Sequence, residues 1–283
     1  MTGPAPAAGL SISLSTPKPD SNRAGAEMVS QSGSPVSFPS TVTVPAGSTT
    51  VSFSAGTKGV QAQTTVQITA AYGTLNSKMA TLTLVPPAVA ALSFSPDSPI
   101  GGQSTTGTIT LTAAAPADGA TIPLTLSASS HGCGPAPTAP ANVVVPGGSA
   151  SGTFTVSTSP GMGEYFYYVS GKSARILLRE PLITQNTLVF PSSVKGGTAV
   201  QAKLVFNGAA GPPATCPNSH QLSSSNTALA QVPTSVTTPQ GASSVPFMMT
   251  TAAVPSTQTV TITVYGNVGY GYASYQKTLT LTP

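Results

Sequence analysis

The chain has 283 residues, of which only 6% are charged, and ten Lys and Arg against six Asp and Glu give it a formal net charge of +4. The basic residues are scattered and form no run that could follow a phosphate backbone, so we expect no nucleic-acid partner. No apolar stretch is long enough to span a bilayer, and the N-terminus shows no signal-peptide pattern, so neither a membrane span nor a signal peptide is expected in this chain.

Apolar residues make up 39% of the chain, and Gly and Pro number 28 each. The apolar residues alternate with Ser and Thr in short runs, which is the pattern of half-buried strands separated by turns. The composition and this alternation predict a folded all-β protein.

The first predicted domain covers residues 1–87 and opens with Leu10, Ile12 and Leu14 alternating with Ser. A segment that holds Lys18 and Glu27 follows, and we interpret it as a solvated loop. Further strands are predicted at 42–44, 51–53, 66–70 and 82–84.

The second and third predicted domains cover residues 88–183 and 184–283. In the second, seven alternating runs occur in roughly 95 residues with turn signals between them, which is typical of a Greek-key immunoglobulin-like (Ig-like) sandwich. These runs lie at 92–94, 108–111, 122–126, 143–145, 153–156, 165–169 and 176–178. The third domain repeats the pattern, from 188–190 to 279–281.

One phrase recurs in all three domains. A Pro-x-Gly turn lies at 45–47, 146–148 and 239–241, and each turn is followed by an alternating run that contains a Phe. Those residues are Phe53, Phe154 and Phe247. Three matched copies indicate a tandem repeat.

The chain resembles the tandem Ig-like β-sandwich repeats of large bacterial secreted and cell-surface proteins. The resemblance rests on a Gly-Gly turn, an alternating strand, a Pro-rich turn, the Val-Pro-x-Gly phrase and a closing Thr-Leu-Thr-Leu strand, and it covers the whole chain. It implies an extracellular or cell-surface location and an elongated, non-catalytic segment for spacing, presentation or adhesion. Such repeats specify a fold far better than a function.

The first copy departs from this pattern. Residues 3–9 match the turn at 116–119, so the equivalent of 92–111 is missing and the first domain should lack its two N-terminal strands. We favour a fragment of a longer protein with neighbouring Ig-like repeats. The alternative is that another copy or chain pairs with the open face by β-augmentation, as in an extracellular filament assembled by strand complementation.

No residue pattern predicts catalysis. The six carboxylates form no adjacent acid/base pair, and neither a Gly-x-Ser-x-Gly elbow nor a glycine-rich phosphate loop is present. We therefore expect no enzyme activity, no catalytic residue and no cofactor.

Both cysteines and both histidines lie in two short segments, His131 with Cys133 and Cys216 with His220. In a seven-strand sandwich the loop that holds Cys133 and the loop that holds Cys216 should face each other where the second and third domains meet. A Cys133–Cys216 disulfide is the favoured prediction, which suits an oxidising compartment. A Cys₂His₂ zinc site formed by these four residues and two unlinked thiols remain as alternatives.

Tyrosines cluster near the C-terminus. Exposed tyrosines can stack on sugar rings, so Tyr270, Tyr272 and Tyr275 are candidates for glycan stacking in a carbohydrate-binding or adhesin module. Packing at the domain junction is the commoner role of such residues.

Overall fold

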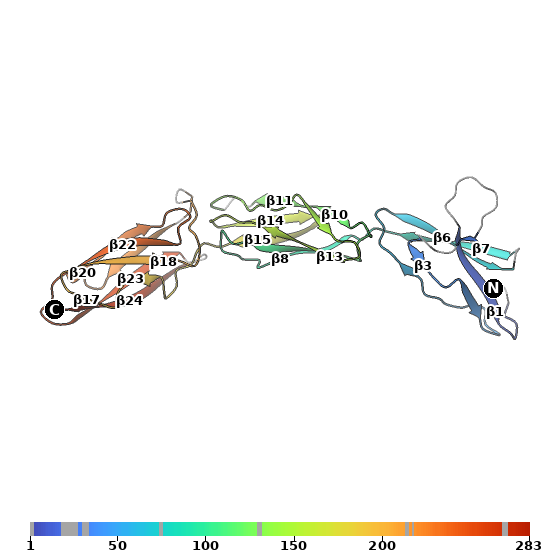
Figure 1. Cartoon of the computed structure of the whole chain (residues 1–283), viewed down its shortest axis with the longest axis horizontal. Coiled ribbons are helices and arrows are strands. Elements are labelled where there is room, and N and C mark those ends of the chain that lie inside the picture. The colour runs from blue at the N-terminus through green and yellow to red at the C-terminus, as the bar shows by residue number, and fades with distance from the viewer. Residues whose placement is uncertain are drawn as a thin grey trace. The chain divides into compact units, whose positions relative to one another are not determined.

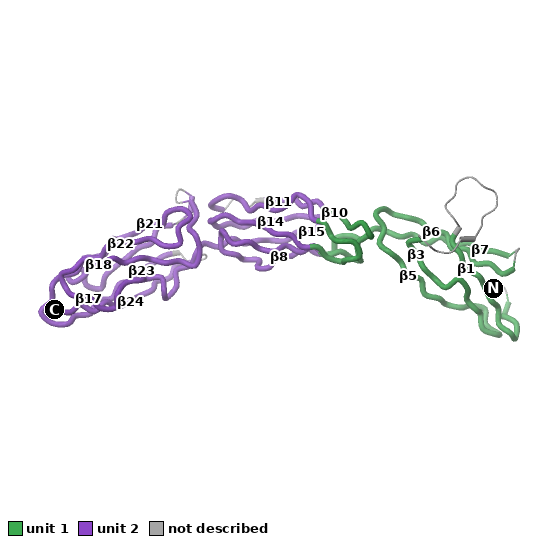
Figure 2. The backbone as a smooth tube through the Cα atoms, viewed as in Figure 1, with its two compact units in different colours: residues 1–90, 110–122, 144–152 green, residues 91–109, 123–143, 153–283 purple. Residues whose placement is uncertain are grey.

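A computed structural model describes residues 3–17, 28–29, 34–73, 76–128, 132–212, 215–216, 218–267 and 271–283. Every regular element in these ranges is a β-strand, so the all-β prediction is confirmed (Figure 1). The chain forms two compact units (Figure 2). The first contains 1–90, 110–122 and 144–152, and the second contains 91–109, 123–143 and 153–283. Because the border between the units crosses the predicted second domain, the division into three domains stays a prediction.

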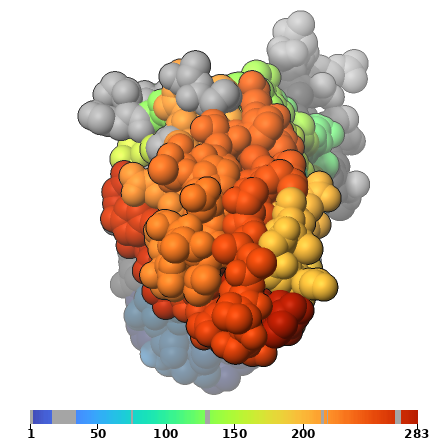
Figure 3. All heavy atoms as spheres, turned by 90° about the vertical axis from the view of Figure 1, so that its left-hand side faces the viewer, coloured from blue at the N-terminus to red at the C-terminus, as the bar shows by residue number. Residues whose placement is uncertain are grey.

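The C-terminal sandwich has the complete Ig-like arrangement, with two facing sheets. One has the order β16-β18-β22-β20 and the other β17-β24-β23-β19-β21. β17 pairs in parallel with β24, so the N-terminal part of this sandwich contributes a strand to each sheet. Figure 3 shows the sandwich in space-filling form, in yellow to red. The bounds are β16 (Leu188–Val189), β17 (Ser193–Lys195), β18 (Ala199–Val205), β19 (Ser219–Ser224), β20 (Ala230–Gln231), β21 (Ser235–Thr237), β22 (Ser244–Thr251), β23 (Gln258–Asn267) and β24 (Tyr272–Thr282).

The core of this sandwich follows from the alternation in its sequence. On β18, Val200, Ala202 and Leu204 are buried while the residues between them are exposed. On β22, Phe247 and Met249 follow the same rule. Side chains at every second position therefore fill the space between the two sheets.

The strands of the second copy repeat this order. β8 (Val89–Ser95), β9 (Thr105–Leu111) and β13 (Ser151–Val156) form one sheet in the order β13-β9-β8. β11 (Thr125–Ala128), β14 (Gly163–Val169) and β15 (Lys172–Leu178) form another in the order β11-β14-β15, and β10 (Ala120–Pro123) pairs with β12 (Asn142–Val145). A parallel bridge between Ile100 and Arg179 corresponds to the β17–β24 pairing.

The first unit contains a smaller set of pairings. Its main sheet joins β1 to β4, β6 and β2 and ends in the β6–β7 hairpin, and β3 pairs separately with β5. Among the described residues of 1–87, no strand corresponds to β16 or β18. The bounds are β1 (Leu10–Pro17), β2 (Met28–Val29), β3 (Val36–Ser37), β4 (Thr41–Val44), β5 (Gly56–Thr57), β6 (Thr64–Tyr72) and β7 (Asn76–Leu84).

The Pro-x-Gly phrase is structurally equivalent in its three copies. In each copy a buried alanine donates its backbone N–H to the residue after the turn. The three bonds are Ala5 to Ser48 at 2.9 Å, Ala115 to Ser149 at 2.8 Å and Ala210 to Ala242 at 2.9 Å. The internal repeat inferred from the sequence therefore extends to the backbone hydrogen bonds.

One predicted strand is absent. Residues 51–53 were expected to form a strand like 153–156, yet they lie in no strand, and Val51 and Phe53 are exposed. The equivalent strand β13 is paired with β9, and β22 with β18. Among the described residues of 1–87 no strand occupies this position, so the alternating residues have no ladder to join.

The described residues include no helix that is long and apolar enough to cross a bilayer.

Candidate functional site

The two cysteines are joined in a disulfide within the second unit. The Cys133–Cys216 bond is the pairing favoured from the sequence, its Cα atoms are 5.2 Å apart, and both residues are buried. Backbone hydrogen bonds hold each cysteine. Cys133 exchanges two with Met162, at 2.8 and 3.1 Å, and the N–H of Cys216 donates to the carbonyl of Pro212 at 2.8 Å. The bond thus links the loop after β11 to the loop before β19.

Glycines allow both cysteine loops to approach a third loop, between β13 and β14, which contains Gly161. A Cβ at Gly211 would lie 2.5 Å from the Cys216 sulfur and 3.1 Å from the Gly161 Cα. A Cβ at Gly161 would overlap the Cys133 carbonyl, and its φ of 151° favours glycine. A side chain at either position would push the β13–β14 loop away from the loop that it contacts.

A small pocket lies close to the disulfide. Its polar lining residues are Glu180, Asn218, His220 and Thr238, all four buried, and its apolar lining residues are Pro181, Phe206 and Ala210. Its volume is about 20 Å³, which is enough for one water molecule. The Asn218 amide donates to the Gly211 carbonyl at 2.6 Å. Within the described residues, the Glu180 Oε1, His220 Nδ1 and Thr238 Oγ1 atoms have no hydrogen-bond partner.

Burial shifts the pKa of both ionisable groups in this cavity toward the neutral form. It raises the pKa of Glu180 to about 7 and lowers the pKa of His220. The His220 ring also stacks on Phe206, with centroids 4.7 Å apart. Near neutral pH the imidazole is therefore uncharged and the carboxyl is only partly ionised.

The zinc alternative is wrong for this structure. The ligand atoms of Cys133, Cys216 and Glu180 lie within 4.8 Å of one another, but the two sulfurs are bonded to each other and offer no thiolate. His220 is a buried residue of β19, and His131 lies outside the described residues.

The three glycan candidates have different outcomes. Tyr270 lies outside the described residues. Tyr272 is 67% exposed and stacks on the exposed Tyr265, with ring centroids 5.3 Å apart and planes 8° apart. Tyr275 is partly buried against the core of the C-terminal sandwich, so its role as a free stacking surface is not supported. Of the three candidates, Tyr272 is exposed and forms a pair with Tyr265, and the glycan role of Tyr270 stays a prediction.

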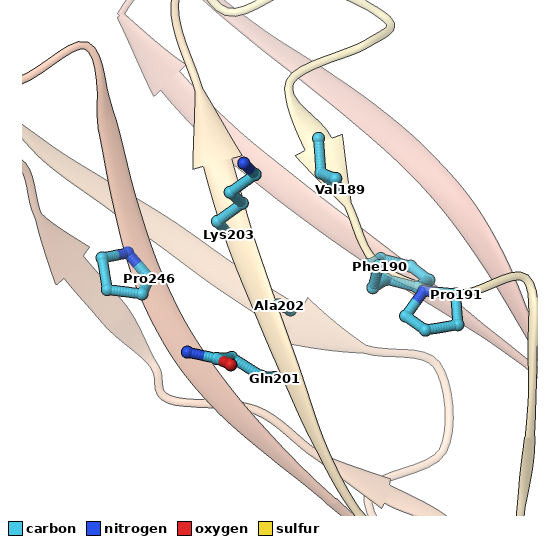
Figure 4. A pocket seen from close by; sticks show the side chains of 7 residues that line it. All are labelled: Val189, Phe190, Pro191, Gln201, Ala202, Lys203 and Pro246. Carbon is cyan, nitrogen blue, oxygen red and sulfur yellow. The ribbon is translucent and has the colours of Figure 1, made fainter.

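An open groove of about 410 Å³ lies over β16, β18 and β22 (Figure 4). The Phe190 ring in it is buried and carries the Lys277 ammonium 4.7 Å from its centroid, so little aromatic surface is available. Neither Tyr265 nor Tyr272 lines the groove. Its lining residues are Val189, Phe190, Pro191, Gln201, Ala202, Lys203 and Pro246.

Sequence reasoning missed Glu180, Asn218 and Thr238. Glu180 lies between Arg179 and Pro181, close to the predicted border between the second and third domains, and no local signal marks it as buried. Asn218 lies two residues from Cys216, so its proximity to the disulfide was the one available clue.

These features define an all-β protein built from Ig-like sandwiches and crosslinked by an internal disulfide. No family model and no curated protein matches the chain. Among solved structures it is similar to the Escherichia coli adhesin FdeC, with 15% identity over 99% of this chain and 94% of that one and a TM-score of 0.33. It is also similar to the Yersinia pseudotuberculosis adhesin InvE, with 14% identity over 68% of this chain and 58% of that one and a TM-score of 0.31. A third similar structure is the titin I9–I11 tandem, with 9% identity over 96% of this chain and 87% of that one and a TM-score of 0.27. Similarities this low say nothing about function.

Proposed function

We propose that the chain is a non-catalytic structural segment of an extracellular or cell-surface protein, which spaces or presents other parts of that protein. The observation that carries the proposal is the buried Cys133–Cys216 bond. It links loops of the predicted second and third domains and restrains bending there, and a structural disulfide of this kind persists in oxidising compartments. The sparse charge and the repeated sandwich fit the same role.

Small-angle X-ray scattering of the oxidised chain and of the Cys133→Ala/Cys216→Ala double variant tests this proposal. We expect the oxidised chain to scatter as one elongated particle whose conformations differ little in their maximum dimension. The double variant should show a broader distribution because its domains bend more freely. A compact oxidised particle, or equal flexibility of the two proteins, would contradict a spacer role.

The exposed Tyr265–Tyr272 pair supports a second candidate, a carbohydrate-binding or adhesin module. Flat aromatic surfaces in water suit sugar rings, and the outer ring face of such a stack is available. Glycan-array binding should be lost on Tyr272→Ala and kept on Tyr168→Ala, which alters an exposed tyrosine of β14. Absence of binding by the unaltered chain would remove this candidate.

A further inference from the structure

A buried carboxyl group lies next to both sulfurs of the disulfide. The two sulfurs of Cys133 and Cys216 and a carboxylate oxygen of Glu180 lie within 4.8 Å of one another. All three residues are buried. The carboxyl group is therefore close enough to exchange a proton with either sulfur, after a short movement or through one intervening water molecule.

The folded structure gives this carboxyl group no partner. The Glu180 Oε1 atom is buried and has no hydrogen-bond partner within the described residues. The nearest cation in sequence, Arg179, is exposed. Burying a carboxyl group without a partner is unfavourable, so its position calls for an explanation. The finished disulfide, which neither binds nor releases a proton, provides none.

The groups around Glu180 leave its carboxyl free to exchange a proton. Of the residues that line the pocket with it, Asn218 and Thr238 are uncharged and His220 alone is ionisable. Burial lowers the pKa of His220, so this ring carries no charge near neutral pH. Burial, and no charged neighbour, raises the pKa of Glu180 to about 7. The carboxyl group therefore changes its protonation state near neutral pH.

A proton must leave this site when the disulfide forms. One reduced cysteine first reacts with an external disulfide compound, which gives a mixed disulfide and releases one thiolate of the oxidant. The second cysteine then loses its thiol proton, and its thiolate attacks the mixed disulfide. The Cys133–Cys216 bond forms, the bond to the oxidant breaks, and the oxidant's second sulfur departs as a thiolate.

We propose that Glu180 is the base that accepts this thiol proton and thereby speeds closure of the Cys133–Cys216 bond. Because its carboxylate lies near both sulfurs, it serves whichever cysteine is the second to react. A carboxylate whose pKa is about 7 binds a thiol proton more strongly than an ordinary carboxylate, and it is still largely ionised just above neutral pH. When a thiol opens the bond, the protonated carboxyl returns the proton to the departing sulfur.

The burial of the two cysteines makes a base inside the site important. Cys133 and Cys216 are each 4% exposed, so hydroxide and buffer bases reach their sulfurs poorly as the loops close. Apolar surroundings also raise the pKa of a thiol, which leaves less of the reactive thiolate near neutral pH. A carboxylate beside both sulfurs compensates for the missing solvent.

The rate of ring closure in the full chain tests the proposal. The chain is reduced in urea and refolded at acidic pH, and tyrosine fluorescence shows that it has folded. Oxidised glutathione is then added at a series of pH values. Acid quenching and mass spectrometry separate the reduced, mixed-disulfide and closed forms, which gives the rate constant for conversion of the mixed disulfide to the closed form.

The unaltered chain and Glu180→Gln should differ in how closure depends on pH. For the unaltered chain we expect the rate constant to rise about twofold between pH 7 and 8, as the last of Glu180 ionises. In Glu180→Gln closure needs free thiolate, so its rate constant should rise about tenfold over the same interval. The variant should close about tenfold more slowly at pH 7 and nearly as fast above about pH 9. Glu164→Gln, which removes the carboxylate paired with Arg175, is the matched control and should follow the unaltered chain.

Three outcomes would overturn the proposal. One is equal closure by the unaltered chain and Glu180→Gln at pH 7. Another is a loss in Glu180→Gln that is the same at every pH, because altered packing of the loops slows closure regardless of protonation. The third is a pH profile that Glu180→Gln leaves unchanged and His220→Gln alters, which would make the imidazole the base. The spacer role concerns bending of the oxidised chain and is measured by scattering, so either proposal can fail without the other.

Discussion

Glu180 and His220 line the same pocket, and their pKa shifts make the free energy of unfolding change with pH in opposite directions. The folded-state pKa of Glu180 is about 7, above its ordinary value of 4.5, so the free energy of unfolding falls as pH rises through this interval. The pKa of His220 is lowered, so the free energy of unfolding falls as the pH drops below 6.5, where the unfolded chain binds a proton that the folded chain does not. About one pH unit above 6.5 His220 is largely neutral in both the folded and the unfolded state, so of these two groups Glu180 alone still titrates.

Glu180→Gln should therefore remove a loss of stability at alkaline pH. Between pH 6.5 and 8.5 we expect the unaltered chain to lose on the order of 1 kcal/mol of unfolding free energy relative to the variant. Urea denaturation of both proteins across this range measures the difference. If the free energies of unfolding of the two proteins change with pH in parallel, the pKa of Glu180 is not raised in the folded state.

At the scale of the strand, alternation proved insufficient to form one. Residues 51–53 share the pattern of β13 and β22, and the sequence predicted a strand in all three copies. Only the two that lie beside β9 or β18 are strands. The turn phrase was predictable because its Pro and Gly act locally, whereas a strand depends on hydrogen bonds to a neighbour that is often far away in the sequence.

The Gly107–Phe154 contact gives a test of strand-to-strand packing. Gly107→Ala places a methyl group where the Phe154 ring lies, so the ring must shift, and we expect a loss of about 1–3 kcal/mol. Thermal and urea unfolding measure the loss. Gly271→Ala is the matched control, because a Cβ at Gly271 meets no atom within 4 Å. Equal stability of the two variants would show that the Phe154 ring moves aside without a measurable cost.

At the scale of the whole molecule, fold topology made the disulfide predictable. Both cysteines lie in loops whose positions follow from the order of strands in a sandwich, so their proximity could be inferred without side-chain detail. Glu180 could not be placed in this way. Its burial depends on how strand β19, which carries His220, and the loops that hold Cys133 and Cys216 lie around it, whereas a charged residue is usually exposed.

The same disulfide should govern how the second unit unfolds. It spans 83 residues of sequence, so it restricts the unfolded chain strongly. The Cys133→Ala/Cys216→Ala variant should lose on the order of 3 kcal/mol of unfolding free energy. The loss should appear as a lower urea midpoint of the transition followed by tyrosine fluorescence. Reductant should lower the midpoint of the unaltered chain to that of the variant and leave the variant unchanged. If the reduced and oxidised chains unfold at the same urea concentration, the bond does not stabilise the fold by lowering the conformational entropy of the unfolded chain.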